Sequence, residues 1–242
     1  VPKKSPDTIY VGLNDRDPAW HDVYRVSIST GKRELVRKNT DRIAGWVFDL
    51  EGQLRMAVRT TDKGDTEVLK VLPEGFKTVY TCSVFETCGP DRFHKDGKRV
   101  YMQTNKGDVD LTRLVLFDPA TGKEELVESD PMSRVDFGGA IFSEKTDELV
   151  GTSYEDERTR VYFRDESWKA DYELLRSKFP GKDVSLGSST ADDRVLLVTA
   201  SSDADPGERY LFDRTTKKLA LQYKVRERIP REHMAEMKAV RY

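Results

Sequence analysis

The chain has 242 residues, of which 37% are hydrophobic and 35% charged, and its formal net charge is −2 at pH 7. This length is enough for one or two domains with a sizeable core. Both signs of charge are interspersed without a basic stripe, and no apolar run approaches the roughly 18 residues of a membrane span, so the sequence predicts no nucleic-acid partner and no membrane partner.

The chain begins at Val1 rather than Met, and no signal-like segment stands at its start. We therefore expect the natural N-terminus to lie upstream, so export cannot be judged from these residues. A cytoplasmic location is favoured, and a periplasmic one stays open.

A short pattern recurs along the chain, in which an apolar strand ends in a polar turn and a second strand follows. Three copies have a turn glycine, Gly31, Gly75 and Gly122, at separations of 44 and 47 residues, and a fourth copy covers Leu211–Leu219. A second series of turns, at positions 52, 97, 147 and 193, advances in steps of 45, 50 and 46. Both series of turns repeat at intervals of about 45 to 50 residues, and short strands lie between the turns. The sequence therefore predicts a β-propeller with one repeat per blade.

The first blade lacks an innermost strand. Strands are predicted at 8–13, 23–28 and 35–36, in the second, third and fourth places of a blade. Residues 1–7 are polar and contain two prolines, which disfavour a strand. Since propellers often close their ring with strands from both termini, a C-terminal strand at 237–242 is the candidate for the empty place.

The later blades follow the full repeat. Leu54, Met56 and Val58 stand at every second position, which is typical of a strand with one buried face. The strands predicted for the second and third blades lie at 43–49, 54–58, 68–72, 77–81, 100–102 and 114–117. Those predicted for the fourth and fifth blades lie at 140–142, 149–150, 184–186 and 195–198.

The fourth blade departs from the pattern after Asp165, where a hairpin should follow. Four apolar side chains at spacings of 4, 3 and 4 share one face of a helix: Trp168, Tyr172, Leu175 and Phe179. Ser167 is predicted to cap this helix, and Pro180–Gly181 to end it. We interpret the segment near 168–179 as an amphipathic helix on the outside of its blade, with a surface for a second domain as the alternative.

Cys82 and Cys88 are the two cysteines of the chain. Two cysteines do not make a disulfide framework, and zinc needs more ligands than they supply. A disulfide would close a small loop in an oxidising compartment, but two unlinked thiols in or beside a strand are the favoured interpretation.

The sequence contains no motif that carries catalysis. It has no nucleophile elbow, P-loop, dinucleotide fingerprint or H-E-x-x-H, and Gly187–Thr190 lacks the second glycine of an elbow. Asp108, Asp110 and the run Asp203–Gly207 are interpreted as solvated turns, because the Gly and Glu of a calcium loop do not follow them. We therefore predict no catalytic residue, no cofactor-binding residue, no metal ligand and no cofactor. Four large aromatic side chains are expected to pack between blades, with the lining of a central funnel as the alternative: Trp20, Trp46, Tyr154 and Trp168.

The chain also contains three longer stretches, Gly12–Val26, Val150–Glu155 and Asp203–Asp213, in that order. With the helix near 168–179, they resemble the propeller domain of the prolyl oligopeptidase family of serine peptidases, in its acylaminoacyl-peptidase and dipeptidyl-aminopeptidase-like bacterial branch. The end of the chain, 234–242, resembles the connector that leads into the first strand of the family's α/β-hydrolase domain.

This resemblance implies that 1–229 holds about five blades of a seven-bladed ring, and that 230–242 leads toward an α/β-hydrolase domain of the same parent chain. The family's Ser–Asp–His triad would lie in that domain, and none of it is matched here. The segment would then be non-catalytic, cover the active-site entrance and restrict access to short peptide substrates. Open blade edges would favour self-association.

Two other functions stay open at this stage. A free-standing five-bladed propeller could bind a protein or a glycan. A five-bladed glycoside hydrolase would use carboxylates around a central channel, and such a pair cannot be chosen from the sequence.

Overall fold

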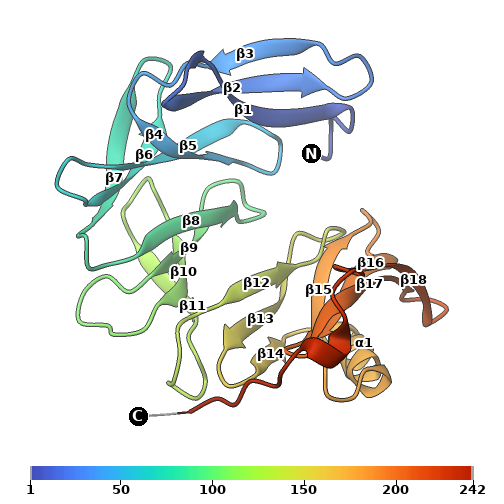
Figure 1. Cartoon of the computed structure of the whole chain (residues 1–242). Coiled ribbons are helices and arrows are strands. Elements are labelled where there is room, and N and C mark those ends of the chain that lie inside the picture. Colours follow the sequence, from blue (N-terminus) through green and yellow to red (C-terminus); the bar gives the residue numbers. More distant parts are fainter. Residues whose placement is uncertain (1, 241–242) are drawn as a thin grey trace. The chain divides into compact units, whose positions relative to one another are not determined.

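The computed structural model describes residues 2–240 and consists mainly of antiparallel β-sheets (Figure 1). The chain divides between Ser133 and Arg134 into two compact units, which are described separately. Each of its five sheets corresponds to one predicted repeat. The prediction of an all-β protein with about five propeller blades and one short helix is confirmed. No helix of residues 2–240 is long and apolar enough to cross a membrane.

The first unit contains three sheets, and the strands of each follow one another in chain order. The first sheet is three-stranded and consists of β1 (Thr8–Asp17), β2 (Trp20–Ser27) and β3 (Arg33–Arg37). The second consists of β4 (Ile43–Phe48), β5 (Leu54–Thr60), β6 (Thr66–Val71) and β7 (Phe76–Cys82). The third consists of β8 (Cys88–Phe93), β9 (Val100–Thr104), β10 (Arg113–Phe117) and β11 (Glu124–Glu128).

The turn markers share a backbone feature that explains their period. Gly52 and Gly97 have φ angles of 79° and 66°, and their counterparts Asp147 and Asp193 have φ angles of 58° and 57°. Glycine enters this left-handed region freely, and Asp is among the residues that tolerate it best. The hairpin between the first two strands of a blade therefore keeps its place when the residue changes from Gly to Asp.

The core of the first unit lies between its second and third sheets. Strand alternation puts Met56 and Val68 on one face of the second sheet and Ala57 and Leu69 on the other, and all four are buried. One apolar cluster joins the second sheet to the third: Val47, Met56, Val68, Tyr80, Cys82, Cys88, Phe93, Val100, Met102, Val115 and Phe117. Burial on both faces explains why this part of the sequence is rich in apolar residues at adjacent positions.

Cys82 and Cys88 form a disulfide, so the expectation of two unlinked thiols was wrong. Cys82 ends β7 and Cys88 begins β8, and their Cα atoms are 6.0 Å apart, a separation that suits a disulfide. Sequence spacing could not reveal this, because the connection has to turn back on itself to bring the two side chains together. The bond joins the outermost strand of the second sheet to the first strand of the third.

Removing this disulfide should lower the free energy of unfolding of the chain by about 2 kcal/mol, since it releases a short closed loop in the unfolded state. The change to make is the double variant Cys82→Ala/Cys88→Ala, followed by urea denaturation. Reductant should destabilise the wild type to a similar extent and leave the double variant unchanged. A wild type that is insensitive to reductant would contradict the assignment.

The second unit contains two sheets and the helix. The first of these sheets consists of β12 (Gly139–Phe142), β13 (Leu149–Glu155) and β14 (Thr159–Phe163), and α1 (Glu166–Lys178) follows in place of a fourth strand. The other consists of β15 (Asp183–Ser189), β16 (Val195–Ser202), β17 (Asp205–Asp213) and β18 (Lys218–Lys224).

Helix α1 is capped by Asp165, not by Ser167 as predicted. Asp165 Oδ1 accepts hydrogen bonds from the backbone N–H groups of Ser167 and Trp168, at 2.9 and 3.1 Å. The helix therefore begins two residues earlier than its apolar pattern does, because a cap precedes the first buried position. It ends before Pro180, as predicted.

The apolar face of α1 packs against both sheets of its unit, as predicted for an amphipathic helix. Trp168, Tyr172 and Leu175 are buried in one cluster with side chains from β13, β15, β16 and β17. The Tyr172 ring also lies 5.2 Å from that of Phe163 on β14. The helix thus fills the space that a fourth strand would cover in this blade.

Two predictions near the C-terminus were wrong. Asp205 and Gly207 belong to β17 rather than to a turn, since the β16–β17 connection is only two residues long and Ser202 already pairs with Asp205. Residues 237–240 form no strand, and residues 241–242 lie outside the described residues. The first sheet accordingly contains only β1, β2 and β3 among residues 2–240.

Candidate functional site

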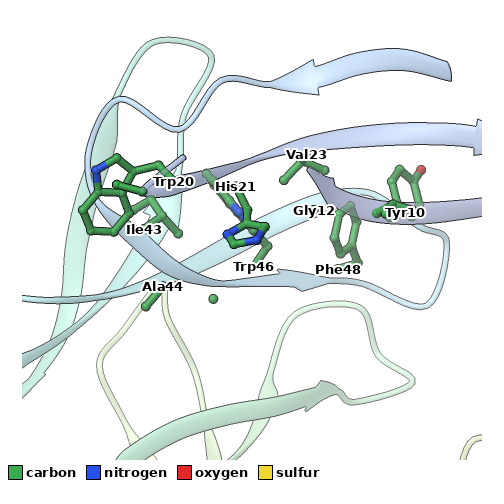
Figure 2. Close-up of a pocket in the computed structure, with 12 residues that line it drawn as sticks. Tyr10, Gly12, Trp20, His21, Val23, Ile43, Ala44, Trp46 and Phe48 are labelled. Carbon is green, nitrogen blue, oxygen red and sulfur yellow. The ribbon is translucent and has the colours of Figure 1, made fainter. Parts of the chain in front are cut away.

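A pocket with aromatic walls lies between the first and second sheets of the first unit, with a volume of about 440 Å³ (Figure 2). Strands β1 and β2 form one side and β4 the other. Its principal side chains are Tyr10, Trp20, His21, Val23, Ile43, Trp46 and Phe48. It is the candidate site of this unit because it combines large apolar walls with a few polar atoms.

Strand alternation positions the walls of this pocket. Positions 10 and 12 of β1 share one face, as do positions 46 and 48 of β4, whereas the pairing of β4 is irregular between Ile43 and Gly45. Tyr10 stacks on Phe48 with ring centroids 4.2 Å apart, and its hydroxyl donates to the Gly52 carbonyl at 2.7 Å. Figure 2 shows this stacked pair at one end of the pocket and Trp20 at the other. Gly12 keeps the middle open, because a Cβ atom there would lie 3.3 Å from the Cβ of His21.

A buried carboxylate behind the pocket holds the first sheet against the start of β4. Asp22 accepts hydrogen bonds from Arg16 Nε and Nη2 at 2.6 and 2.8 Å, and from the Asn39 backbone N–H at 2.7 Å. The Asn39 side chain in turn accepts from the Ile43 N–H at 2.9 Å and donates to the Ile43 carbonyl at 2.8 Å. This chain of bonds sets the position of the β4 wall.

Hydrogen bonding from the Arg16 guanidinium lowers the pKa of Asp22 below its usual 3.8, more strongly than burial raises it. Its stabilising effect is therefore fully present above pH 3.8 and is lost as the pH falls through its lower folded-state pKa. Asp22→Asn should lower the free energy of unfolding by about 2 kcal/mol at neutral pH. Urea denaturation over a pH series should show the wild type converging on the variant in acid. A difference that does not depend on pH would contradict this account.

The pocket has no catalytic arrangement. His21 and Tyr10 are its titratable side chains, and neither lies beside a serine, a cysteine or a carboxylate in the lining. Residues 2–240 contain no group of three or more His, Cys, Asp or Glu side chains that could hold a metal ion. The walls suit an apolar side chain rather than a reacting group.

The aromatic residues singled out from the sequence have two different placements. Tyr154 and Trp168 are buried, as predicted for packing. Trp20 and Trp46 line the pocket. Trp46 also packs against the buried cluster of Ile43, Ala57 and Leu69, with its ring centroid 6.1 Å from that of Phe76, as predicted for packing. Sequence spacing could not distinguish the two buried side chains from the two that line the pocket.

The structure also places the acidic residues that the sequence analysis interpreted as turns. Asp108 and Asp110 are exposed in the β9–β10 connection. Asp205 instead forms hydrogen bonds with Lys182 Nζ at 2.6 Å and Arg231 Nε at 2.9 Å. Burial raises its pKa, but the bond to Lys182 and other attractive contacts outweigh this and leave the pKa below its usual value.

Sequence reasoning missed two buried carboxylates of the second unit. Asp193, in the β15–β16 turn, accepts from the Ser143 hydroxyl and from the Glu144 N–H of the β12–β13 turn. Asp171 on α1 accepts from Arg214 Nε at 2.7 Å and is also paired with Lys217. Each carboxylate joins two neighbouring elements, and no local sequence motif predicts either contact.

Comparisons with known proteins extend over nearly the whole chain. No protein-family model matches it. It is 33% identical over 232 residues to dipeptidyl aminopeptidase BIII of Pseudoxanthomonas mexicana, covering 95% of the chain and 33% of that protein. It is 26% identical over 231 residues to dipeptidyl peptidase family member 6 of Caenorhabditis elegans, covering 89% of the chain and 30% of that protein. The chain thus spans about a third of the length of the curated relatives it matches.

Solved structures agree on the fold. A prolyl endopeptidase structure matches 93% of the chain with 35% of its own length, at a TM-score of 0.53 and 17% identity. Prolyl oligopeptidase B from Galerina marginata matches 84% of the chain with 30% of its own length, at a TM-score of 0.52 and 13% identity. TolB from Acinetobacter baumannii matches 90% of the chain with 52% of its own length, at a TM-score of 0.52 and 12% identity.

Five consecutive blade-like sheets, one of them completed by a helix, define the chain as a β-propeller segment. Its sequence relationship to a dipeptidyl aminopeptidase and its likeness in fold to prolyl oligopeptidases fit one family. The chain is thus similar over nearly its whole length to part of a dipeptidyl aminopeptidase, and its fold fits a propeller domain of the prolyl oligopeptidase family.

Proposed function

We propose that this chain is the non-catalytic propeller segment of a serine oligopeptidase or aminopeptidase. It covers the active-site entrance of an α/β-hydrolase domain in the same parent polypeptide and restricts access to short peptides. The observation that carries this proposal is the 33% identity to a dipeptidyl aminopeptidase over 95% of the chain but only 33% of that enzyme. The remainder of such an enzyme is where catalytic groups would lie.

The same relationship supports a proposed domain assignment. Residues 1–229 form blades of a seven-bladed ring, and residues 230–242 lead toward the hydrolase domain. Arg231 supports the start of this connector, because its side chain forms a hydrogen bond with Asp205 of β17 at 2.9 Å.

Restriction by size needs a rigid passage rather than a reactive side chain. The exposed positions of β15, the first strand of its sheet, include three small residues: Ser185, Gly187 and Ser188. Small side chains leave room for an extended peptide and let backbone approach it closely. The proposed passage would exclude a folded protein.

A bulky residue on an innermost strand of the parent enzyme tests this role. Ser188→Trp should lower kcat/KM for a peptide of about thirty residues at least tenfold, while kcat/KM for a dipeptidyl chromogenic substrate stays within about twofold, because only the larger substrate needs the full opening. Lys178→Trp, on the exposed side of α1, is the matched control and should change neither value. An equal loss for both substrates, or no loss for either, would contradict the gating role.

A further inference from the structure

A second pocket lies within the second unit, between the sheet of β12, β13 and β14 and the sheet that begins with β15. Its volume is about 410 Å³, in the range of sites for small ligands. Helix α1 contributes Tyr172 to it. Acidic and hydroxyl side chains gather in its lining, unlike that of the aromatic pocket: Ser153, Glu155, Thr159, Tyr172, Asp183, Ser185 and Ser201.

The walls of this pocket also have an apolar part. Ile141, Val161 and Leu186 come from three different strands, and each is a partly buried side chain. Together with the Tyr172 ring they offer a surface on which an aliphatic chain can pack. The lining thus combines apolar walls with groups that accept hydrogen bonds.

The described residues supply two carboxylates to the lining, Glu155 and Asp183, and no lysine or arginine. Glu155 accepts a hydrogen bond from the Thr159 hydroxyl at 3.1 Å, across the end of the β13–β14 hairpin. Asp183 Oδ2 lies 3.8 Å from Nη1 of Arg158, whose side chain is 59% exposed. That distance is longer than a hydrogen bond, and an exposed ion pair contributes little stability. A cation that enters the pocket therefore has only a weak competitor for Asp183.

Tyr172 supplies the observation that points to an occupant. It is only 7% exposed, and its hydroxyl forms no hydrogen bond with residues 2–240. Burial raises the pKa of this hydroxyl; the charge of Arg176 opposes the rise, and the charges of Asp183 and Glu155 add to it. The hydroxyl therefore stays neutral at pH 7. A buried hydroxyl without a partner costs free energy until an occupant pairs with it.

We propose that this pocket binds an organic cation on an aliphatic stem, such as the side chain of lysine or arginine. The stem packs against Ile141, Val161 and the Tyr172 ring. The cationic head lies between Glu155 and Asp183 and donates to the Tyr172 hydroxyl, so that its N–H groups form charge-assisted hydrogen bonds. An anion would be repelled by both carboxylates, and a neutral ligand would leave them without a counter-charge. The site does not depend on the proposed peptidase function, because its lining lies wholly within residues 139–201.

Isothermal titration calorimetry of residues 1–242 with Nα-acetyl-lysine methylamide tests the proposal. The α-amine of this compound is acetylated, so only its side chain carries a positive charge. Nα-acetyl-norleucine methylamide has nearly the same stem without the charge and should bind at least about tenfold more weakly. Equal affinity for the two compounds, or no binding of the lysine compound and of n-pentylamine, would overturn the proposal.

The titration with n-pentylamine also distinguishes two sources of the cation. Tighter binding of the lysine compound would indicate a peptide side chain, because its amide groups then add to the affinity. Equal or tighter binding of n-pentylamine would indicate a free amine. Both results support the cation site.

Variants assign the binding to the named side chains. Asp183→Asn should weaken binding of the lysine compound at least about fivefold, and Tyr172→Phe, which keeps the ring, about threefold. Glu166→Gln is the matched control, since its carboxylate on α1 is 87% exposed and outside the lining, and it should change the affinity less than about 1.5-fold. Arg158→Gln should tighten binding about twofold, because it removes the cation that competes for Asp183. Unchanged affinity in both Asp183→Asn and Tyr172→Phe would overturn the proposal.

Discussion

Replacing Asp193 by alanine is expected to lower the free energy of unfolding of the second unit by about 4 kcal/mol. Its carboxylate is buried and accepts from two hydroxyl groups, Ser143 and Ser189, and from the backbone N–H groups of Glu144 and Lys145. Alanine would leave these donors without their acceptor and would also put a strained residue at a φ of 57°. One side chain thus holds the first hairpin of one blade to that of the next.

Fluorescence of Trp168 during urea denaturation measures this loss, in a background where Trp20 and Trp46 are phenylalanine. Asp193→Asn is the informative companion, because Asn tolerates a left-handed backbone but keeps only one acceptor oxygen. It should lose about half as much stability as Asp193→Ala. Equal losses of stability in the two variants would mean that hydrogen bonding alone, and not backbone strain, explains the effect of Asp193→Ala. A loss below about 1 kcal/mol for Asp193→Ala would contradict the proposed role.

Trp168→Ala should destabilise the same unit by about 4 kcal/mol, within the range for truncating a large buried aromatic side chain. The Trp168 side chain is only 4% exposed and belongs to the apolar cluster under α1. The guanidinium carbon of Arg214 lies 4.2 Å from the centroid of its ring, and Arg214 also donates to buried Asp171. Losing the ring therefore removes packing and frees the partner of a buried carboxylate.

Far-UV circular dichroism during denaturation follows this variant without relying on its lost fluorophore. Glu173→Ala lies on the exposed face of the same helix and should change stability by less than about 0.5 kcal/mol. If the two variants behave alike, α1 is not part of the cooperative core of the unit, which would contradict the packing described above.

The blade period was predictable because it depends on local chemistry. Gly52, Gly97, Asp147 and Asp193 each supply a left-handed turn, and apolar residues at alternate positions mark the strands between them. The helix near 168–179 was equally predictable, because the spacing of its apolar residues indicates one buried face.

The remaining features depend on contacts between distant parts of the chain. The bonds from Asp193 to Ser143 and from Asp22 to Asn39 cross from one sheet to the next or to the segment that leads to it. Nothing near Asp193 in sequence distinguishes it from the many solvated acids of a chain with 43 acidic residues. The pocket at Trp46 was missed for the same reason, because two strands of different blades must meet to form it.

The most direct test of the central claim is the intact mass of the native polypeptide that contains this sequence, together with its labelling by a serine-reactive fluorophosphonate. We predict a polypeptide about three times as long as this chain, labelled on a serine outside residues 1–242, as expected for a peptidase with this segment as its propeller. A native polypeptide that ends near Tyr242 and takes up no label would contradict the assignment and leave a propeller that acts by binding alone.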